Sequence, residues 1–220
     1  YSLETGRARE LVSNVDAIDD VAVRPGTGEI FISDAAGGGQ GGVYQVDRQT
    51  GTLQSVVSGL DFAGGLAFDS SRDLFYQQMN SNFVGEIHRQ SIDDSGSSLS
   101  FGDSQLLASG SGVPTMDIAV DGEGDIFATG SDVVMFDASD GYAQSLFFSN
   151  SNQFQFAGEI DFLSGNGPFE AGASRNSSRL AFVPDFRANS AMLVAVPEPT
   201  TGALVLLGCG WLMRRSRRRC

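Results

Sequence analysis

Four carboxylate residues recur along the chain at or just before short apolar stretches, and their chemistry suits a divalent cation. They are Asp20, Asp61, Asp117 and Glu159. Carboxylate oxygens are the ligands that Ca²⁺ prefers in proteins, so calcium is the metal that this set would take. Carboxylates at strand starts also accept hydrogen bonds from nearby backbone N–H groups. We expect this capping role, and hence no cofactor, with a calcium site as the alternative.

The sequence offers little for nucleophilic catalysis or for a transition-metal site. His88 is the only histidine, and the two cysteines, Cys209 and Cys220, both lie near the end of the chain. No Gly-x-Ser-x-Gly segment, the usual setting of a serine nucleophile, occurs in the sequence. We therefore expect His88 to be a surface or half-buried residue without a catalytic role, and no catalytic residue in the body.

A repeat along the chain must position these residues. Three segments share an apolar-Ala-apolar stretch, a turn and an aliphatic-Phe pair: Asp20–Ser33, Gly65–Gln77 and Asp117–Thr129. The residues Val21, Leu66 and Ile118 correspond, at separations of 45 and 52. Alternation of apolar and polar residues predicts half-buried strands joined by hairpin turns. The repeated phenylalanines are expected in the core: Phe31, Phe75 and Phe127.

Each unit continues with two more strands, so four strands occupy about 45–50 residues, the period of a propeller blade. The third strands are expected at Gly42–Asp47, Gly85–Asp93 and Asp132–Asp137, and a looser fourth unit at Glu159–Leu163, Arg179–Val183 and Ala191–Val196. We predict an all-β, propeller-like array of about four four-stranded blades over residues 8–196. An irregular β-sandwich is the alternative fold.

Two arrangements of the blades remain open. Ala8–Asn14 could supply the missing outer strand of the fourth unit and close a four-blade ring. The chain could instead be the C-terminal part of a larger propeller.

In its "GLAFD" and "DIF" segments, each followed by a strand and an acidic turn, the body resembles six-bladed propellers of the NHL and SMP-30/gluconolactonase families. The resemblance covers roughly residues 8–196. It implies a divalent cation held on the propeller axis by Glu, Asn and Asp side chains, with an acid as base. The four recurrent carboxylates are the candidates for this site.

Two glycine-containing segments are expected to be structural. Asp121–Asp125 ("DGEGD") alternates acids and glycines like a calcium loop, but it lacks the later Glu of an EF-hand and lies where a hairpin must turn. Ala35–Gly42 is glycine-rich but contains no lysine, so it is not a phosphate-binding loop.

The charge of the chain is unevenly distributed. The sequence has 14 basic residues, none of them lysine, and 27 acidic residues, for a net charge of −13. Five arginines lie at 214–219, so the rest of the chain carries about −18. Binding to phosphates requires clustered cations, so this balance excludes nucleic acid as a partner of the body.

Residues 197–220 form a distinct tail in three parts. It begins with Pro197, Glu198 and Pro199, continues through the apolar residues Ala203, Leu204, Val205, Leu206, Leu207, Trp211 and Leu212, and ends with Arg214, Arg215, Arg217, Arg218 and Arg219. The uncharged run would form a helix about 21 Å long, short for a hydrocarbon core of about 30 Å. We predict a short membrane-inserted helix with its arginines on the cytoplasmic side.

In this order the three parts resemble a PEP-CTERM sorting signal, which occurs on exported proteins of Gram-negative bacteria that make extracellular polysaccharide. The resemblance implies recognition by an exosortase, a membrane-embedded transpeptidase-like enzyme, and cleavage near Pro197–Pro199. It also implies a secretion signal, which we expect to have preceded Tyr1. The expected location is the inner membrane transiently, and then the periplasm, the outer surface or the extracellular matrix.

Together these features favour a non-enzymatic protein of the cell surface or matrix, with a binding or structural role and extracellular polysaccharide as a possible partner. The alternative is an enzyme: a divalent-metal-dependent lactonase or related hydrolase of the SMP-30-like propeller type.

Overall fold

The computed structural model describes residues 10–13, 15–96, 98–130 and 132–148, together with the backbone of three later strands. Its described part is all-β, as predicted, and contains no α-helix; a single short 3₁₀ helix, η1, spans Ala138–Asp140. The predicted C-terminal helix lies outside the described residues.

The strands form four antiparallel sheets in chain order, which we call the first to fourth blades. The first blade contains β1 (Ile18–Val23), β2 (Ile30–Asp34), β3 (Gly41–Val46) and β4 (Leu53–Leu60). The second contains β5 (Phe62–Phe68), β6 (Leu74–Met79), β7 (Gly85–Asp93) and β8 (Ser100–Gly110). The third contains β9 (Asp117–Val120), β10 (Ile126–Thr129), β11 (Val133–Asp137) and β12 (Ala143–Phe148). The described strands of the fourth are β13 (Asp161–Phe162), β14 (Leu180–Asp185) and β15 (Ser190–Ala195).

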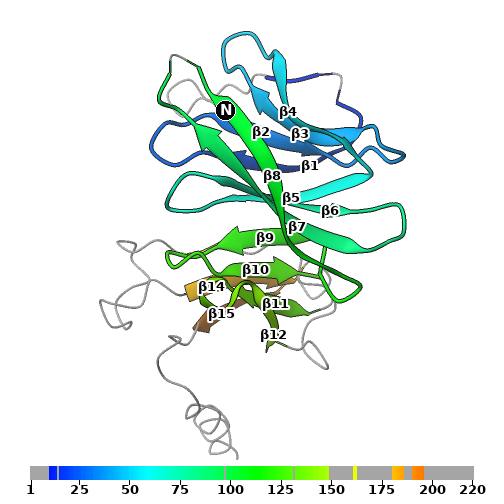
Figure 1. Cartoon of the computed structure of the whole chain (residues 1–220), viewed down its shortest axis with the longest axis vertical. Helices are drawn as coiled ribbons and strands as arrows, with labels where there is room; N and C mark the ends of the chain where they lie inside the picture. The colour runs from blue at the N-terminus through cyan, green and yellow to red at the C-terminus, as the bar shows by residue number, and fades with distance from the viewer. Residues whose placement is uncertain are drawn as a thin grey trace, which may run out of the picture.

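The blades follow one another in space as they do in sequence (Figure 1). Within each complete blade every strand pairs with its sequence neighbours. The first strand of each blade contacts the first strand of the next, so that β1, β5, β9 and β13 form a continuous inner row. This is the arrangement of propeller blades around an axis, and it confirms the predicted array of four-stranded sheets.

Strand pairing confirms the repeat residue by residue. The matched residues Val21, Leu66 and Ile118 pair with Ile32, Tyr76 and Ala128, each two residues into the second strand of its blade. One predicted strand differs: the described residues of Ala8–Asn14, residues 10–13, are not in a strand.

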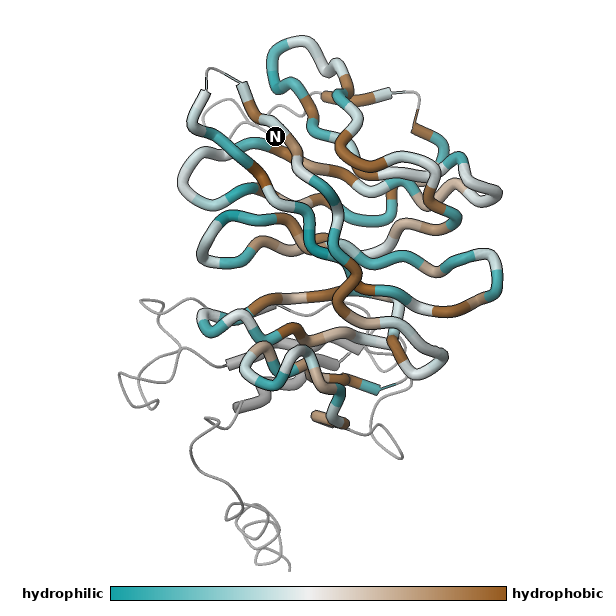
Figure 2. Tube along the Cα trace, in the orientation of Figure 1, coloured by the Kyte–Doolittle hydropathy of each residue, from teal (hydrophilic) through white to brown (hydrophobic). Residues whose placement is uncertain are grey.

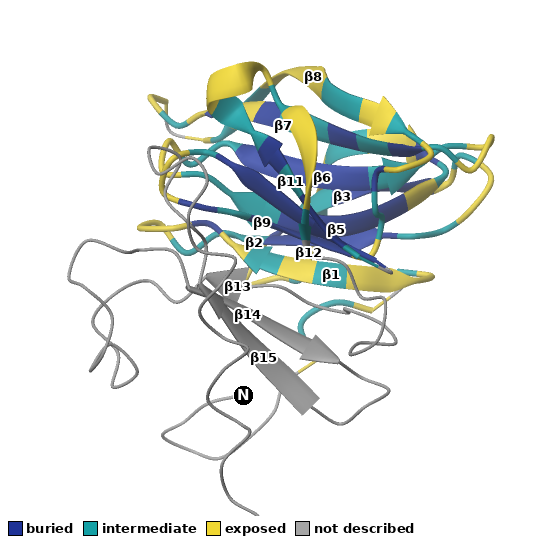
Figure 3. Ribbon diagram, turned by 90° about the horizontal axis from the view of Figure 1, so that it is seen from below, coloured by how far each residue is buried: buried dark blue, intermediate teal, exposed yellow. Residues whose placement is uncertain are grey.

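Apolar residues from neighbouring blades meet in two cores. The core between the first and second blades includes Phe31, Leu66 and Tyr76, and the core between the second and third includes Phe75 and Ile118. Because successive side chains of a strand point to opposite faces, β6 presents Tyr76 to one core and Phe75 to the other. The apolar segments lie along the strands in Figure 2, and the buried segments run through the middle of the blades in Figure 3.

The repeated phenylalanines are buried, as predicted: Phe31 and Phe127 are 0 % exposed and Phe75 is 1 % exposed. The turn at Asp121–Asp125 is also the predicted hairpin. Asp121 Oδ1 accepts hydrogen bonds from the backbone N–H groups of Glu123 and Asp125, at 2.9 and 3.0 Å. The acidic turn therefore caps its own backbone.

Candidate functional site

The strand register places three residues at the same position of the inner strands β1, β5 and β9, namely Asp20, Gly65 and Asp117. Each directly precedes the matched apolar residue of its repeat. Asp20 and Asp117 therefore occupy equivalent positions in the first and third blades. In the second blade this position holds Gly65.

Asp61 lies apart from this position. It is half-buried and stands between β4 and β5, because β5 begins at Phe62, earlier than the repeat predicts. Four residues of extended strand span about 13 Å, so Asp61 is separated from Gly65 by roughly that distance along β5. Asp61 therefore directly precedes its inner strand, but it does not share the strand position of Asp20 and Asp117.

The carboxylate of Asp20 connects the first two blades. Its Oδ2 accepts a hydrogen bond from the backbone N–H of Leu66 at 2.7 Å, and its Oδ1 accepts one from the backbone N–H of Val21 at 2.6 Å. Its own backbone N–H donates to Ser33 Oγ at 3.0 Å. Asp20, the third residue of β1, thus accepts backbone N–H groups from β1 and β5, and its carboxylate lies against β5 beside Gly65.

Asp117 approaches Gly65 from the third blade. A Cβ atom on Gly65 would lie 2.7 Å from Asp117 Oδ1 and 2.6 Å from the backbone nitrogen of Ile118. Asp117 itself is 9 % exposed. Any side chain at this position would collide with β9, so glycine is required where β5 and β9 lie close together.

The second strands of the blades add a buried polar residue at each matching position: Ser33, Gln77 and Thr129, all 0 % exposed. Ser33 Oγ accepts from Asp20, as described above, and Thr129 Oγ1 donates to the backbone oxygen of Asp117 at 3.4 Å. The separations of 44 and 52 repeat those of the neighbouring strand positions, so alignment of the repeats would have identified this layer.

Gln77 differs from the other two residues of this layer because one of its atoms has no partner. Its Nε2 donates to the backbone oxygen of Pro114 at 2.8 Å, whereas its buried Oε1 has no hydrogen bond. A Cβ atom on Gly64 would lie 3.6 Å from this Oε1. A buried acceptor left without a hydrogen bond lowers the stability of the folded state by about 1–3 kcal/mol, so binding of a donor or a cation to Gln77 Oε1 would be favourable.

The oxygens near Gly64 and Gly65 are of the kind that Ca²⁺ prefers, namely the carboxylates of Asp20 and Asp117 and the amide oxygen of Gln77. Among the described residues no group of three or more His, Cys, Asp or Glu could hold a metal ion, so an amide oxygen would have to complete the set. The fourth predicted ligand, Glu159, lies outside the described residues.

The charge of this region is concentrated on β1. Asp19 is next to Asp20, and burial together with the negative charge of Asp20 raises the pKa of Asp19 above its ordinary value. Loss of solvent around Asp19 is the larger cause of this shift, and the neighbouring charge adds to it.

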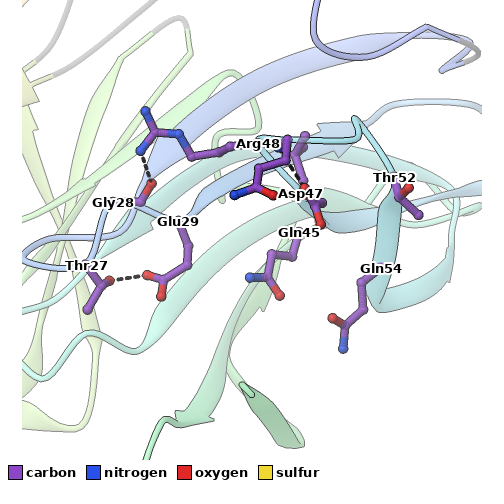
Figure 4. Close-up of a pocket in the computed structure, with 10 residues that line it drawn as sticks. Thr27, Gly28, Glu29, Gln45, Asp47, Arg48, Thr52 and Gln54 are labelled. Carbon is purple, nitrogen blue, oxygen red and sulfur yellow. Dashed lines mark hydrogen bonds between the residues drawn. The ribbon is translucent and has the colours of Figure 1, made fainter. Parts of the chain in front are cut away.

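A separate polar groove of about 590 Å³ lies on the first blade (Figure 4). It is lined by the β1–β2 and β3–β4 turns and by two glutamines, Gln45 and Gln54, that pair across β3 and β4. In the β1–β2 turn, Thr27 donates a hydrogen bond to Glu29. Arg48, in the β3–β4 turn, donates from Nη1 to the backbone oxygen of Gly28 at 3.5 Å. The groove shares no residue with the site around Gly65.

Solved structures share this fold. They include a gluconolactonase from Xanthomonas campestris (TM-score 0.56, 18 % identity, 79 % of this chain and 56 % of that one). A calcium-binding protein, regucalcin, from Agrobacterium tumefaciens matches with a TM-score of 0.55 and 16 % identity, over 76 % of this chain and 52 % of that one. An auxiliary nutrient binding protein from Bacteroides ovatus has a TM-score of 0.58 and 12 % identity, over 84 % of this chain and 46 % of that one.

The chain therefore spans about half the length of the solved structures that it matches. No protein-family model matches it, and neither does any curated protein. The resemblance of the body to gluconolactonase-like propellers is supported at the level of the fold, and the resemblance of the tail to a sorting signal stays a prediction.

These comparisons contradict the expectation of a non-enzymatic binding or structural protein. Gluconolactonases and regucalcin are among the solved structures that share this fold. The physical reason for the error is that a propeller site takes one residue from each blade. Such a site leaves no local motif, so the lack of a catalytic motif did not argue against an enzyme.

The predicted membrane segment, residues 203–212, and the sorting motif, residues 197–199, lie outside the described residues. Within the part of the chain that the structure describes, no helix has the length and apolar character needed to cross a membrane.

Proposed function

We propose that this chain is a divalent-metal-dependent hydrolase that opens lactones at the inner row of strands. The observation that carries the proposal is the buried Gln77 Oε1, which has no hydrogen-bond partner and faces Gly64. Asp20 and Asp117 lie on the inner strands of the two neighbouring blades, next to Gly65, which follows Gly64 in β5. The gluconolactonase among the solved structures supports the choice of lactones as the substrate class.

Each residue has a part in this proposal. Asp20 and Asp117 would hold the cation through their carboxylates, Gln77 would contribute a neutral oxygen, and Gly65 would leave the space between them open. When bound, the cation would polarise the carbonyl of the lactone and stabilise the negative charge that develops on its oxygen. Hydrolysis adds water to the carbonyl carbon and breaks the ring C–O bond, so the product is a hydroxy acid.

Calorimetric titration with Ca²⁺, Mg²⁺, Mn²⁺ and Zn²⁺, combined with assays of five- and six-membered lactones, tests this function. We expect binding of at least one of these ions and metal-dependent turnover, both lost in Asp117→Asn. Asp61→Asn is the matched control, because Asp61 lies outside the site, and it should behave like the wild type. Absence of both binding and turnover in the wild-type protein would overturn the proposal.

We also propose that the chain is exported and sorted by its tail. The support is the order of Pro197–Pro199, an apolar run and five arginines at 214–219. Deletion of residues 197–220, followed by cell fractionation, is the test. We expect the truncated protein to escape membrane association and processing; unchanged location and processing would contradict the proposal.

The polar groove on the first blade supports an extracellular polysaccharide as a partner. Amide and carboxylate side chains such as Gln45, Gln54 and Glu29 hydrogen-bond to hydroxyl groups, and they line one continuous groove. Glycan-array binding of the wild-type protein and of a Gln45→Ala/Gln54→Ala variant tests this partner. Equal binding of the two proteins to every glycan would exclude the groove as the binding site.

A further inference from the structure

The only histidine of the chain lies between a carboxylate and a hydroxyl group. His88 Nε2 is 3.0 Å from Glu86 Oε2, and His88 Nδ1 is 3.5 Å from Ser104 Oγ. Glu86 and His88 belong to β7, whereas Ser104 belongs to the neighbouring strand β8. The three side chains form the series carboxylate, imidazole and hydroxyl that activates serine nucleophiles on unrelated folds.

Packing fixes the orientation of the imidazole. The ring of Tyr76 stacks on the ring of His88 at 5.0 Å between centroids, with an angle of 6° between the planes. Tyr76 is 2 % exposed, so this stack has little freedom to move. The phenol oxygen of Tyr76 also lies 2.7 Å from Ser104 Oγ, which holds the serine over the same ring.

Glu86 is held by three donors. Gln78 Nε2 donates to Glu86 Oε2 at 2.5 Å, and Asn80 Nδ2 donates to Glu86 Oε1 at 2.8 Å. Burial alone would raise the pKa of Glu86, but the hydrogen bonds from His88, Gln78 and Asn80 outweigh it and lower the pKa below its ordinary value. Glu86 is therefore an ionised acceptor at neutral pH.

The hydrogen-bond pattern assigns the tautomer of His88. His88 Nε2 lies 3.0 Å from Glu86 Oε2 and 3.3 Å from Gln78 Nε2. Because an ionised carboxylate accepts but does not donate, and Glu86 is the nearer of the two, we assign the ring proton to Nε2, where it is donated to Glu86. This leaves Nδ1 as an acceptor that faces the hydroxyl group of Ser104. Tyr76 can then donate its phenol proton to Ser104 Oγ while Ser104 donates to His88.

We propose that Ser104, His88 and Glu86 form a second, metal-independent site that hydrolyses small carboxylic esters through an acyl-serine intermediate. Ser104 is exposed, and Leu106, two residues along the same face of β8, is 52 % exposed. Leu106 gives an apolar contact for a short acyl chain. β8 is the outermost strand of its sheet, so a substrate can reach Ser104 from the open edge.

The reaction balances with water as the only co-reactant. Ser104 Oγ forms a bond to the carbonyl carbon, and its proton passes to His88 Nδ1. The ester C–O bond breaks, and His88 gives the proton to the leaving alcohol. Water then attacks the acyl-serine, His88 takes a proton from that water, and the proton returns to Ser104 as the carboxylic acid leaves.

Covalent labelling of the full chain in excess EDTA tests the site, because chelation removes any contribution of the proposed lactonase. The protein is incubated with a fluorophosphonate, and the labelled peptide is identified by mass spectrometry; hydrolysis of p-nitrophenyl acetate is followed in parallel. We expect one label, on Ser104, and ester hydrolysis that EDTA does not reduce. A label on another residue, or none, would overturn the proposal without affecting the lactonase.

Variants separate catalysis from chance reactivity. General-base assistance contributes about 10²–10⁴-fold, so His88→Gln should be labelled at least about 100-fold more slowly than the wild type. Ser100→Ala removes another exposed serine of β8, four residues from Ser104, and should leave labelling unchanged. Labelling of His88→Gln at the wild-type rate, with an unchanged thermal unfolding midpoint, would show that the imidazole does not activate Ser104.

Discussion

Asp20 on β1 accepts a hydrogen bond from the backbone N–H of Leu66 on β5, 2.7 Å away and in the next blade. The bond joins the inner strands of two blades whose facing surfaces also pack through apolar side chains. Asp20 therefore has two roles: it connects neighbouring blades, and it positions a carboxylate beside Gly65.

Replacing Asp20 separates these two roles. Asp20→Ala leaves the N–H of Leu66 without its acceptor, and the loss of a hydrogen bond to a charged group typically costs about 1.5–3 kcal/mol. Asp20→Asn can keep its oxygen on the N–H of Leu66 but gives up the bond to Val21, so it should cost less than Asp20→Ala while still weakening metal binding. Urea unfolding of both variants, with and without Ca²⁺, measures the two effects. Equal destabilisation by Ala and Asn would show that the hydrogen bond is not what matters.

Gly65→Ala should destabilise the chain because its Cβ would lie 2.6 Å from the backbone nitrogen of Ile118. Overpacking of this kind costs typically about 1–3 kcal/mol, and the displaced β9 would also move Asp117. Gly122→Ala is the control, since no atom lies within 4 Å of a Cβ at that position, and its effect should stay within about 0.5 kcal/mol. Thermal unfolding midpoints compare the two. Similar midpoints would mean that β5 and β9 separate without cost.

The fold could be predicted from the sequence because the repeat has a simple physical basis. Alternating apolar residues specify strands that are buried on one face, and the matched residues Val21, Leu66 and Ile118 recur with them. The start of β5 could not be located in this way. The strand begins at Phe62, three residues before the repeated pattern, and a bulge between Ala63 and Leu66 interrupts its register with β6.

The candidate sites were harder to predict than the fold. Asp20 and Asp117 were found because charge at a strand start stands out in sequence, whereas Gly65 and Gln77 have no signal until the repeats are aligned by register. The contact of His88 with Ser104 depends on an irregularity in the pairing of β7 and β8 next to His88, which no spacing rule specifies. A site whose side chains come from different strands can be identified only when the strand pairing is known.

Gln77→Leu tests whether the unpartnered Oε1 serves a cation. Leucine has a similar volume, so the variant removes the oxygen with little change in packing, apart from the bond to Pro114. In the wild type, Ca²⁺ at 100 times its Kd should add about 2.7 kcal/mol of stability. In Gln77→Leu the added stability should fall by more than half. Calorimetric scans with and without Ca²⁺ provide the measurement, and an undiminished shift would remove Gln77 from the set of ligands.

The stability of the chain should depend on Glu86 at acid pH. Burial opposes the ionised form of Glu86, but hydrogen bonds from His88, Gln78 and Asn80 lower its pKa below the ordinary value of 4.5. The unfolded state therefore binds a proton at higher pH than the folded state does. The contribution of Glu86 to stability is fully present above pH 4.5 and is lost as the pH falls through the lowered pKa.

Glu86→Gln removes this titration and keeps most of the hydrogen-bond partners. Between about pH 5 and pH 3, the wild type should therefore lose more stability than Glu86→Gln does. Urea unfolding at intervals of half a pH unit gives the two curves, and their difference isolates Glu86 from the other carboxylates, which both proteins share. Parallel curves over this range would mean that the cluster around His88 does not favour the ionised form of Glu86, and the acceptor assigned to His88 Nε2 would lose its basis.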